Sequence, residues 1–313
     1  MSRVITVGAA QLGPIARNES RTQVVSRLLD LMKQAKSMGC DVVVYPELAL
    51  TNFFPRWYME NQAEIDTFFE PNLPNSDTQP LFDAAAQLGI GFHLGYAELA
   101  LENGKPHRYN TSITVDETGT IVGKYRKIHL PGHRDFEPWR DFQHLEKRYF
   151  EIGNLGFQVF RAFDGILGMC ICNDRRWCET YRVLGLQGVE MIFIGYNTPQ
   201  HNPYDPSSDH LNHFHNHLSM QAGAYQNGTW VVGVAKCGNE EGCMLIGDSA
   251  IIAPSGEIVA KALTVDDELI VARCDLDAGL PYKRTIFNFA AHRHPEHYRL
   301  ICEQTGIQIP NHL

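Results

Sequence analysis

The stretch from Gly165 to Trp177, GILGMCICNDRRW, constrains the fold most strongly, because an apolar run there ends abruptly at a cysteine. The residues from Ile166 to Cys172 are nearly all apolar, which is typical of a strand buried on both faces. The polar residues that follow favour a turn, and the apolar positions after Trp177 recur at helical spacing. The sequence therefore predicts a strand-to-helix elbow with Cys172 at its corner.

Cys172 at such an elbow has the surroundings of a nucleophile. The N–H groups at a helix start carry partial positive charge, which favours a thiolate over a thiol. Without such help only a few per cent of a cysteine with a pKa of about 8.5 is ionised at neutral pH. The 8 cysteines of the chain are too sparse for a disulfide scaffold. Cys170 lies between apolar neighbours, so we interpret it as a core residue.

The composition is that of an ordinary globular protein and argues against two classes of partner. Hydrophobic residues make up 44% of the 313 residues, yet no run of about 18 apolar residues could span a membrane. The net charge of −9 and the dispersed Lys and Arg residues disfavour nucleic acid as a partner. Residues 1–11 enter a strand pattern at once, without an apolar leader, so we expect a cytoplasmic protein.

Apolar periodicity along the first half of the chain predicts alternating strands and helices. The first unit is a strand at Val4–Gln11, a helix at about Ser20–Met38 and a strand at Asp41–Tyr45. Residues 90–127 contain three strand-like segments separated by Gly-containing turns, which indicates an antiparallel meander.

The second half continues this pattern. A strand is predicted at Val189–Gly195, and a helix at about Leu211–Asn227. Four strands follow, and one of them runs unbroken through residues 244–254, MLIGDSAIIAP.

The chain as a whole is predicted to be one domain over residues 1–313, because no Gly-, Ser- or Pro-rich linker divides it. About ten or more strands with few helices predict an α/β fold with four layers, an α-β-β-α sandwich in which helices cover two packed sheets. Residues 281–313 are rich in aromatic residues and have no domain of their own. We expect this C-terminal tail to pack on a second subunit.

Charged residues stand at the ends of two predicted strands, where α/β folds place functional groups. Glu47 follows one strand in VYPELAL, and Lys127 ends another in GKYRK. Each has an ordinary alternative, since Glu47 fits a solvated loop charge and Lys127 is one of three closely spaced cations. Glu146 and His144 lie in a long connection that could reach a cleft, with a structural salt bridge as the alternative.

Three histidines in the sequence HFHNH raise the question of a metal site. In a helix only His213 and His217 share a face, and neither a suitably spaced carboxylate nor a CxxC pair accompanies them. We therefore predict no metal and no cofactor, and favour hydrogen-bonding or surface histidines.

Three segments carry a family resemblance when they are taken together: VYPELAL, GKYRKIHLPG and MCICNDRRW, in this order. With them the chain resembles the nitrilase superfamily of carbon–nitrogen hydrolases over almost its entire length. Within that superfamily FFPRW, LGYAEL, FQHLEKRYFE and the paired arginines of CNDRRW are similar to the N-carbamoyl-D-amino acid amidohydrolases, or D-carbamoylases. The resemblance implies a nitrilase-like sandwich, a homodimer or homotetramer, and hydrolysis of N-carbamoyl-D-amino acids to D-amino acid, carbon dioxide and ammonia.

The resemblance also implies catalytic roles. Cys172 would attack the ureido carbonyl, and Glu47 would take its proton and later protonate the departing ammonia. Lys127 and the backbone N–H of Asn173 would hold the oxyanion, where one such donor is worth about 3 to 4 kcal/mol. Glu146 would orient Lys127 or the substrate nitrogen.

An acidic substrate needs a fixed cation, and Arg175 and Arg176 follow the nucleophile closely. We expect Arg176 to bind the substrate carboxylate, and one of the two arginines to pair with an acid such as Asp174. The resemblance adds three residues that line the pocket and three supporting histidines: Asn173, Asn197 and Thr198, and His129, His144 and His215.

Two other functions remain open from the sequence. One is a different amidase or nitrilase of the same superfamily, and the other is a catalytically silent binding protein. The residues alone do not decide between D and L substrates, so only the resemblance favours the D form.

Overall fold

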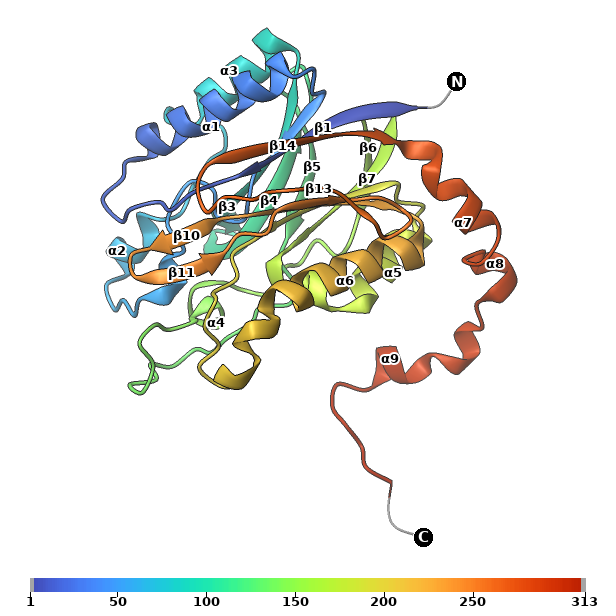
Figure 1. Ribbon diagram of the computed structural model, residues 1–313. Coiled ribbons are helices and arrows are strands. Elements are labelled where there is room, and N and C mark those ends of the chain that lie inside the picture. Colours follow the sequence, from blue (N-terminus) through green and yellow to red (C-terminus); the bar gives the residue numbers. More distant parts are fainter. Residues whose placement is uncertain (1–2, 311–313) are drawn as a thin grey trace.

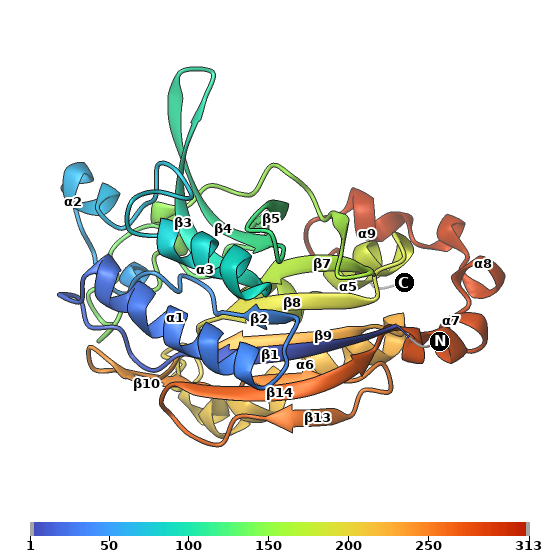
Figure 2. The ribbon, with the colours of Figure 1, turned by 90° about the horizontal axis from the view of Figure 1, so that it is seen from above.

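A computed structural model describes residues 3–310 of the chain, which form four layers with two six-stranded sheets packed face to face (Figures 1 and 2). This is the predicted single-domain α-β-β-α sandwich, so the fold prediction is confirmed. The first sheet runs in the order β14 (Glu268–Asp275), β1 (Val4–Gln11), β2 (Val42–Val44), β3 (Gly91–Glu102), β4 (Lys105–Val115) and β5 (Ile121–Arg126).

The second sheet runs in the order β13 (Ile258–Lys261), β12 (Ala250–Ile252), β9 (Trp230–Ala235), β8 (Met191–Tyr196), β7 (Gly165–Ile171) and β6 (Val159–Ala162). A separate hairpin consists of β10 (Cys237–Glu240) and β11 (Cys243–Ile246). Strands β1, β2 and β3 are parallel to one another, and so are β7, β8 and β9. Carboxyl ends of parallel strands meet at one edge, where such folds bind their ligands.

Helices cover the outer face of each sheet (Figure 1). The longer ones are α1 (Arg21–Ser37) and α3 (Gln79–Leu88) on the first sheet, and α5 (Cys178–Leu186) and α6 (Asn212–Asn227) on the second. The short ones are α2 (Gln62–Asp66), α4 (Glu146–Tyr149), α7 (Leu280–Arg284), α8 (Phe289–His292) and α9 (Arg299–Glu303), with 3-10 turns η1 (Phe54–Arg56), η2 (Cys172–Arg176), η3 (Pro206–Leu211), η4 (Leu276–Gly279) and η5 (Pro295–His297).

The local sequence explains both kinds of element. Ser20 caps α1 through a reciprocal capping box with Gln23, which satisfies backbone donors at the helix start. On β2 the side chains alternate: Val42 and Val44 belong to the core between the sheets, while Val43 faces the helix layer. A strand with both faces covered is apolar throughout, as DVVVY is.

Two details differ from the sequence prediction. The strand predicted over residues 244–254 is divided into β11 and β12, because Gly247 and Asp248 both have positive φ, 63° and 65°. The elbow after β7 is confirmed, but Cys172 has a φ of 47° and begins the 3-10 turn η2, so that the α-helix starts only at Cys178.

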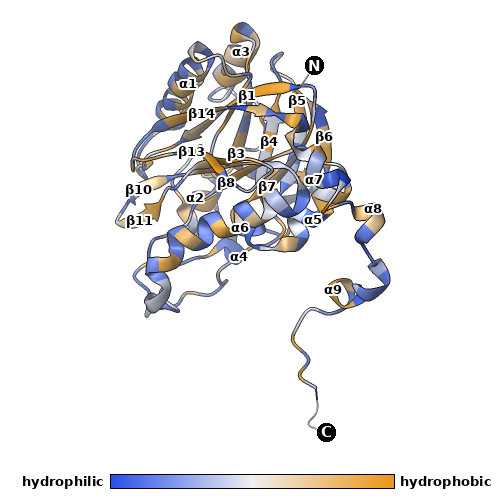
Figure 3. Ribbon diagram, turned by 45° about the vertical axis from the view of Figure 1, so that its right-hand side comes forward, coloured by the Kyte–Doolittle hydropathy of each residue, from blue (hydrophilic) through white to orange (hydrophobic). Residues whose placement is uncertain are grey.

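The C-terminal tail first packs on the helices of the second sheet, where Tyr282 and Phe287 contact Tyr225. Beyond α8 it continues through α9 away from the body (Figures 1 and 3). It carries exposed apolar side chains, with Leu300 69% and Ile301 59% accessible. Its packing on a second subunit stays a prediction. Among the described residues no helix has the length and apolar content needed to cross a membrane.

Candidate active site

A cluster of buried charges lies where several strands end. Glu47 follows β2, Lys127 follows β5, and Glu146 begins α4; the side chains of all three are fully buried. The Nζ of Lys127 lies 2.7 Å from Oε1 of Glu47 and 2.6 Å from Oε2 of Glu146. The fold therefore brings together three charged residues that the sequence places far apart.

Cys172 completes the cluster. Its Sγ and one carboxylate oxygen each of Glu47 and Glu146 all lie within 4.8 Å of one another. Three such groups could also hold a metal ion, but here the Lys127 ammonium already bridges both carboxylates. Within residues 3–310 no other group of three potential metal ligands lies as close.

The surroundings of Cys172 favour the thiol over the thiolate. Burial and the Glu47 charge raise the pKa of Cys172, and the cations Lys127 and Arg175 offset this only in part. This direction is opposite to the one expected from a helix start, because the desolvation of the sulfur acts against the local dipoles. A neighbouring base has to remove the proton.

The two charged partners of the cluster respond to burial differently. Burial acts to lower the pKa of Lys127, but the charges of Cys172, Glu146 and Glu47 raise it above its ordinary value. Burial raises the pKa of Glu146, although Lys127 works against it. Lys127 thus stays a cation next to the nucleophile, as stabilisation of an oxyanion requires.

Amide side chains fix the position of Glu47. Nδ2 of Asn197 donates to the Glu47 carbonyl oxygen at 2.9 Å and to Oε2 at 3.1 Å. Nδ2 of Asn110 donates to Oε1 at 2.8 Å. The side chain of Asn197 is buried against Glu47, and its carbonyl oxygen lies 3.8 Å from the Cys172 Sγ. Its predicted place in the pocket lining stays a prediction. Sequence analysis missed Asn110 altogether.

Two glycines allow the Glu47 backbone to sit between the sheets. A Cβ on Gly195 of β8 would lie 2.4 Å from the Glu47 nitrogen. A Cβ on Gly95 of β3 would lie 2.7 Å from the carbonyl oxygen of Pro46. Both distances are too short for any side chain, so this close approach requires glycine.

Asp174 organises the elbow after Cys172. Its Oδ1 accepts hydrogen bonds from the backbone and from the ring Nδ1 of His129, at 2.9 and 2.8 Å. Its Oδ2 accepts from the Tyr125 hydroxyl at 2.7 Å and the Ile171 N–H at 3.0 Å. The expected pairing of Asp174 with an arginine is therefore wrong, and His129 supports the elbow through Asp174.

The two arginines after the nucleophile differ in environment. Arg175 is fully buried and donates to the Cys172 carbonyl oxygen, to Thr198 Oγ1 and to Asn216 Oδ1 at 2.7, 2.8 and 2.8 Å. Arg176 is exposed, and makes no hydrogen bond or ion pair with any residue in the described part of the chain. Arg175 and burial lower the pKa of Arg176 to about 10, which leaves it charged at neutral pH.

A cavity of about 1000 Å³ opens beside the cluster. Arg176, Thr198, His144 and His215 line it, together with the end of the β10–β11 hairpin. Nε2 of His144 lies 3.2 Å from Oε1 of Glu146, so this histidine connects the cavity with the buried charges. Burial lowers the pKa of His144 well below its ordinary value, which keeps the ring neutral.

Two predicted site residues, and the two histidines considered as metal ligands, need comment. Asn173 does not line this cavity, because its side chain donates to the His129 carbonyl oxygen and lies in a separate groove of about 660 Å³. His215 lines the cavity and lies 5.7 Å from the Phe214 ring in a tilted arrangement, and its side chain has no hydrogen bond among residues 3–310. The histidines at 213 and 217 both contact Asp248 instead of sharing a metal.

Arg56 is a cavity residue that sequence analysis missed. It is only 4% exposed, yet its Nε and Nη2 have no partner within the described residues. Its guanidinium lies 4.6 Å from the centre of the Phe53 ring. The arginine in FFPRW was the available signal, because a cation inside an aromatic segment indicates a cation–π contact.

A buried cysteine beside a carboxylate and a lysine, on a sandwich of two sheets, defines a cysteine-dependent enzyme. Residues 6–284 match the model of the carbon-nitrogen hydrolase family, and the chain belongs to this family. It is a hydrolase of carbon–nitrogen bonds other than peptide bonds, with a catalytic cysteine.

Curated relatives cover nearly the whole chain. The N-carbamoylputrescine amidase of Solanum tuberosum is 28% identical over 97% of each chain. The nitrilase of Pyrococcus abyssi is 31% identical over 80% of this chain and 83% of its own. The citrullinase of Francisella tularensis is 25% identical over 90% and 93%.

Solved structures share the fold. A carbon-nitrogen hydrolase from Helicobacter pylori G27 superposes with a TM-score of 0.81 at 21% identity, over 97% of this chain and 99% of that one. An amidase from Nesterenkonia sp. superposes with a TM-score of 0.70 at 18% identity, over 95% and 96%.

Proposed function

We propose that the protein hydrolyses N-carbamoyl amino acids, with the D form favoured by the resemblance of CNDRRW and its flanking segments. The observation that carries this proposal is Arg176, whose guanidinium has no partner among residues 3–310 and lines the cavity four residues after the nucleophile. A guanidinium binds a carboxylate through two parallel hydrogen bonds. The buried, incompletely paired Arg56 adds positive charge to the same cavity.

The reaction follows from the buried cluster. Glu47 takes the thiol proton, and the Cys172 sulfur attacks the ureido carbon. Lys127 and the Asn173 backbone N–H stabilise the oxyanion until ammonia leaves with the proton held by Glu47. Water activated by Glu47 then cleaves the bond between sulfur and carbon, and the released carbamate loses carbon dioxide to give the amino acid. Glu146 holds Lys127 in place throughout.

A second candidate is the hydrolysis of a carbamoyl amine, which the relatives named N-carbamoylputrescine amidase favour. Asp141 lines the outer part of the cavity and has no hydrogen bond or ion pair with any described residue. Its carboxylate could bind an ammonium group at the far end of such a substrate. The carboxylate of a carbamoyl amino acid lies only two bonds from its ureido nitrogen. The cation that binds it must therefore lie near the nucleophile, and Arg176 meets this condition.

Ammonia release distinguishes the candidates. The substrates are N-carbamoyl-D- and L-phenylglycine, N-carbamoylputrescine, citrulline and a simple nitrile, each given to wild-type protein and to Arg176→Met and Asp141→Asn. We expect the fastest turnover with the D-carbamoyl amino acid, and a KM raised by Arg176→Met only. Faster hydrolysis of N-carbamoylputrescine or the nitrile would overturn the proposal.

We further propose that the tail packs on a second copy of this chain. The family match ends at residue 284, and the apolar side chains beyond it, such as Leu300 and Ile301, have no cover within the described residues. Deletion of residues 285–313 should reduce the molecular mass in sedimentation to that of a monomer. The cytoplasmic location and the absence of nucleic-acid partners stay predictions.

A further inference from the structure

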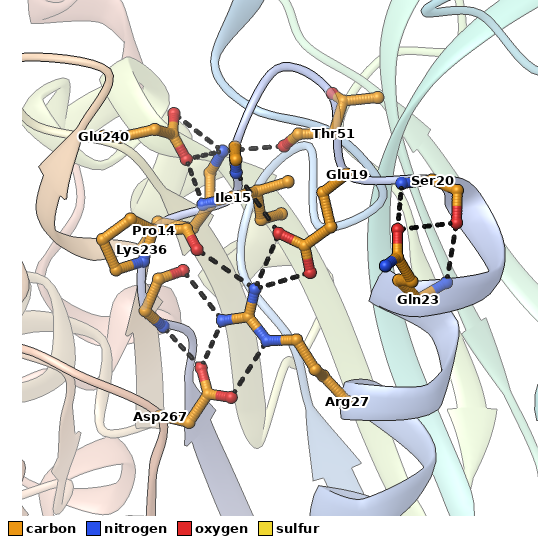
Figure 4. Close-up of polar contacts among 12 residues, drawn as sticks. Pro14, Ile15, Glu19, Ser20, Gln23, Arg27, Thr51, Lys236, Glu240 and Asp267 are labelled. Atoms are coloured by element: carbon orange, nitrogen blue, oxygen red, sulfur yellow. Dashed lines mark hydrogen bonds and ion pairs between the residues drawn. The ribbon is translucent and has the colours of Figure 1, made fainter.

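A second buried ion pair lies close to the active site, between Lys236 and Glu240 (Figure 4). Lys236 follows β9 and is fully buried, and Glu240 at the end of β10 is 2% exposed. The Lys236 Nζ lies 2.9 and 3.2 Å from the two carboxylate oxygens and 2.8 Å from the Thr51 carbonyl oxygen. Three oxygens thus match the three N–H donors of the ammonium.

The Glu240 carboxylate also accepts two backbone hydrogen bonds. Oε1 accepts from the Phe53 N–H at 2.6 Å, and Oε2 accepts from the Ile15 N–H at 3.1 Å. Buried backbone groups in irregular segments need such partners. The ion pair therefore holds the segment 46–56 at two points, the Thr51 carbonyl oxygen and the Phe53 N–H. This segment begins with Pro46 and Glu47.

The segment 46–56 contributes to the site at three places. Glu47 stands at its start, the Phe53 ring contacts the edge of His144 at 5.8 Å between ring centres, and Arg56 lines the cavity. The β10–β11 hairpin that carries Glu240 supplies Gly242 to Met244 to the cavity wall. One ion pair therefore joins the segment that carries the base to the hairpin that lines the cavity.

We propose that Lys236 and Glu240 are positioning residues for Glu47, which hold its carboxylate at the distance where it can take the Cys172 proton. Neither residue lines the cavity, so they act through the segment 46–56. The inference rests on the proposed role of Glu47 as the base, and not on the identity of the substrate.

Electrostatics support the link. Burial lowers the pKa of Lys236, the charges of Glu240 and Glu47 raise it, and Arg56 lowers it. Together these effects leave the pKa of Lys236 below its ordinary value. Its ammonium therefore interacts with Glu47 as well as with its direct partner.

The test measures activation of the thiol without any substrate. Iodoacetamide alkylates Cys172 at a rate that reports removal of its proton, and mass spectrometry of the Cys172 peptide separates it from the exposed Cys178 and Cys302. We expect Lys236→Met and Glu240→Gln to slow this alkylation about 10- to 100-fold, the effect of a displacement of about 1 Å in a catalytic group. Lys236→Arg, which keeps the cation, should restore most of the rate.

Glu190→Gln is the matched control. Glu190 likewise pairs with a cation, Arg3 at 2.6 Å, and accepts a backbone bond from Ile166 at 2.8 Å, but it lies before β8 at the other end of the sheet. Because the Arg3 side chain is 37% exposed, this variant should lose less thermal stability than the two test variants, and it should leave the alkylation of Cys172 unchanged.

Equal alkylation rates in wild type, Lys236→Met and Glu240→Gln would overturn the proposal. If Lys236→Met does not fold, Glu240→Gln tests the proposal instead. The glutamine side chain has the same length as glutamate, but its NH2 group replaces an oxygen that accepts a backbone hydrogen bond. Failure of the wild type to hydrolyse carbamoyl amino acids would overturn the proposed substrate and leave this result unaffected.

Discussion

The ammonium of Lys127 and the carboxylate of Glu47 lie 2.7 Å apart with no exposure to solvent, and Glu146 contacts the same nitrogen at 2.6 Å. One cation therefore compensates two buried carboxylates. Removing one partner of a buried ion pair leaves an uncompensated charge, which costs about 3 to 5 kcal/mol.

Lys127→Met should therefore destabilise the fold as well as abolish hydrolysis. We expect a loss of about 3 to 5 kcal/mol in the free energy of unfolding, measured by urea denaturation. The control is Lys124→Met, whose side chain is 37% exposed beside Glu98 and should cost at most about 1 kcal/mol. Equal losses in the two variants would contradict the assignment of Lys127 as the compensating charge.

Gly195→Ala should displace Glu47, because the added methyl group would lie 2.4 Å from its backbone nitrogen. A shift of about 1 Å in a catalytic group reduces turnover about 100-fold. Steady-state kcat should fall by this order, with substrate KM changed less. Gly168→Ala on β7 is the control, since its methyl group would meet only side chains of α5 and its surroundings, at 3.1 Å or more. A kcat in Gly195→Ala within twofold of wild type would show that Glu47 tolerates the shift.

The two arginines should respond differently to substitution by methionine. Arg176→Met should raise KM for carbamoyl amino acids about 10- to 100-fold, the equivalent of about 1.5 to 3 kcal/mol for hydrogen bonds to a charged group, with little change in melting temperature. Arg175→Met should lower the melting temperature, because it leaves Asn216, Thr198 and the Cys172 carbonyl oxygen without their donor. An unchanged KM in Arg176→Met, with a raised KM in Arg175→Met, would reverse the two assignments.

Local sequence was sufficient for much of this structure. The layers follow from periodicity, since β1, α1 and β2 lie within a few residues of their predicted bounds. The elbow at Cys172 follows from an abrupt change from apolar to polar residues. That Glu47, Lys127 and Cys172 lie together was predicted only through the family resemblance. Local patterns do not predict it, because their proximity depends on how the two sheets stack.

The remaining parts depend on tertiary contacts that a linear pattern does not contain. Asn110 faces Glu47 from the middle of β4, where its direction is set by strand register opposite Ala97. The side-chain partners of Asp174 come from β5 and the segment after it, whereas the sequence suggested one of the two adjacent arginines. The raised pKa of Cys172 follows from burial by distant segments, whereas sequence reasoning saw only the local turn.

His93 should make the fold sensitive to acid. It is fully buried in β3, 5.7 Å from the Phe193 ring, and burial lowers its pKa from 6.5 to about 3. Between these values the unfolded chain binds a proton that the folded chain does not. Stability therefore falls as pH decreases through this window, by about 1.4 kcal/mol per pH unit, or about 2 kcal/mol at pH 5.

His93→Phe should remove the contribution of His93 to acid sensitivity and make the free energy of unfolding depend less on pH, because the phenylalanine ring carries no charge at any pH. Urea unfolding of wild type and variant at pH 7.5 and pH 5 measures the difference. The exposed His201, replaced by glutamine, serves as the control and should keep the wild-type slope. Since His144 and His217 also have lowered pKa values, some acid sensitivity should persist in His93→Phe. If His93→Phe loses as much unfolding free energy between pH 7.5 and pH 5 as wild type does, His93 is not buried as a neutral ring.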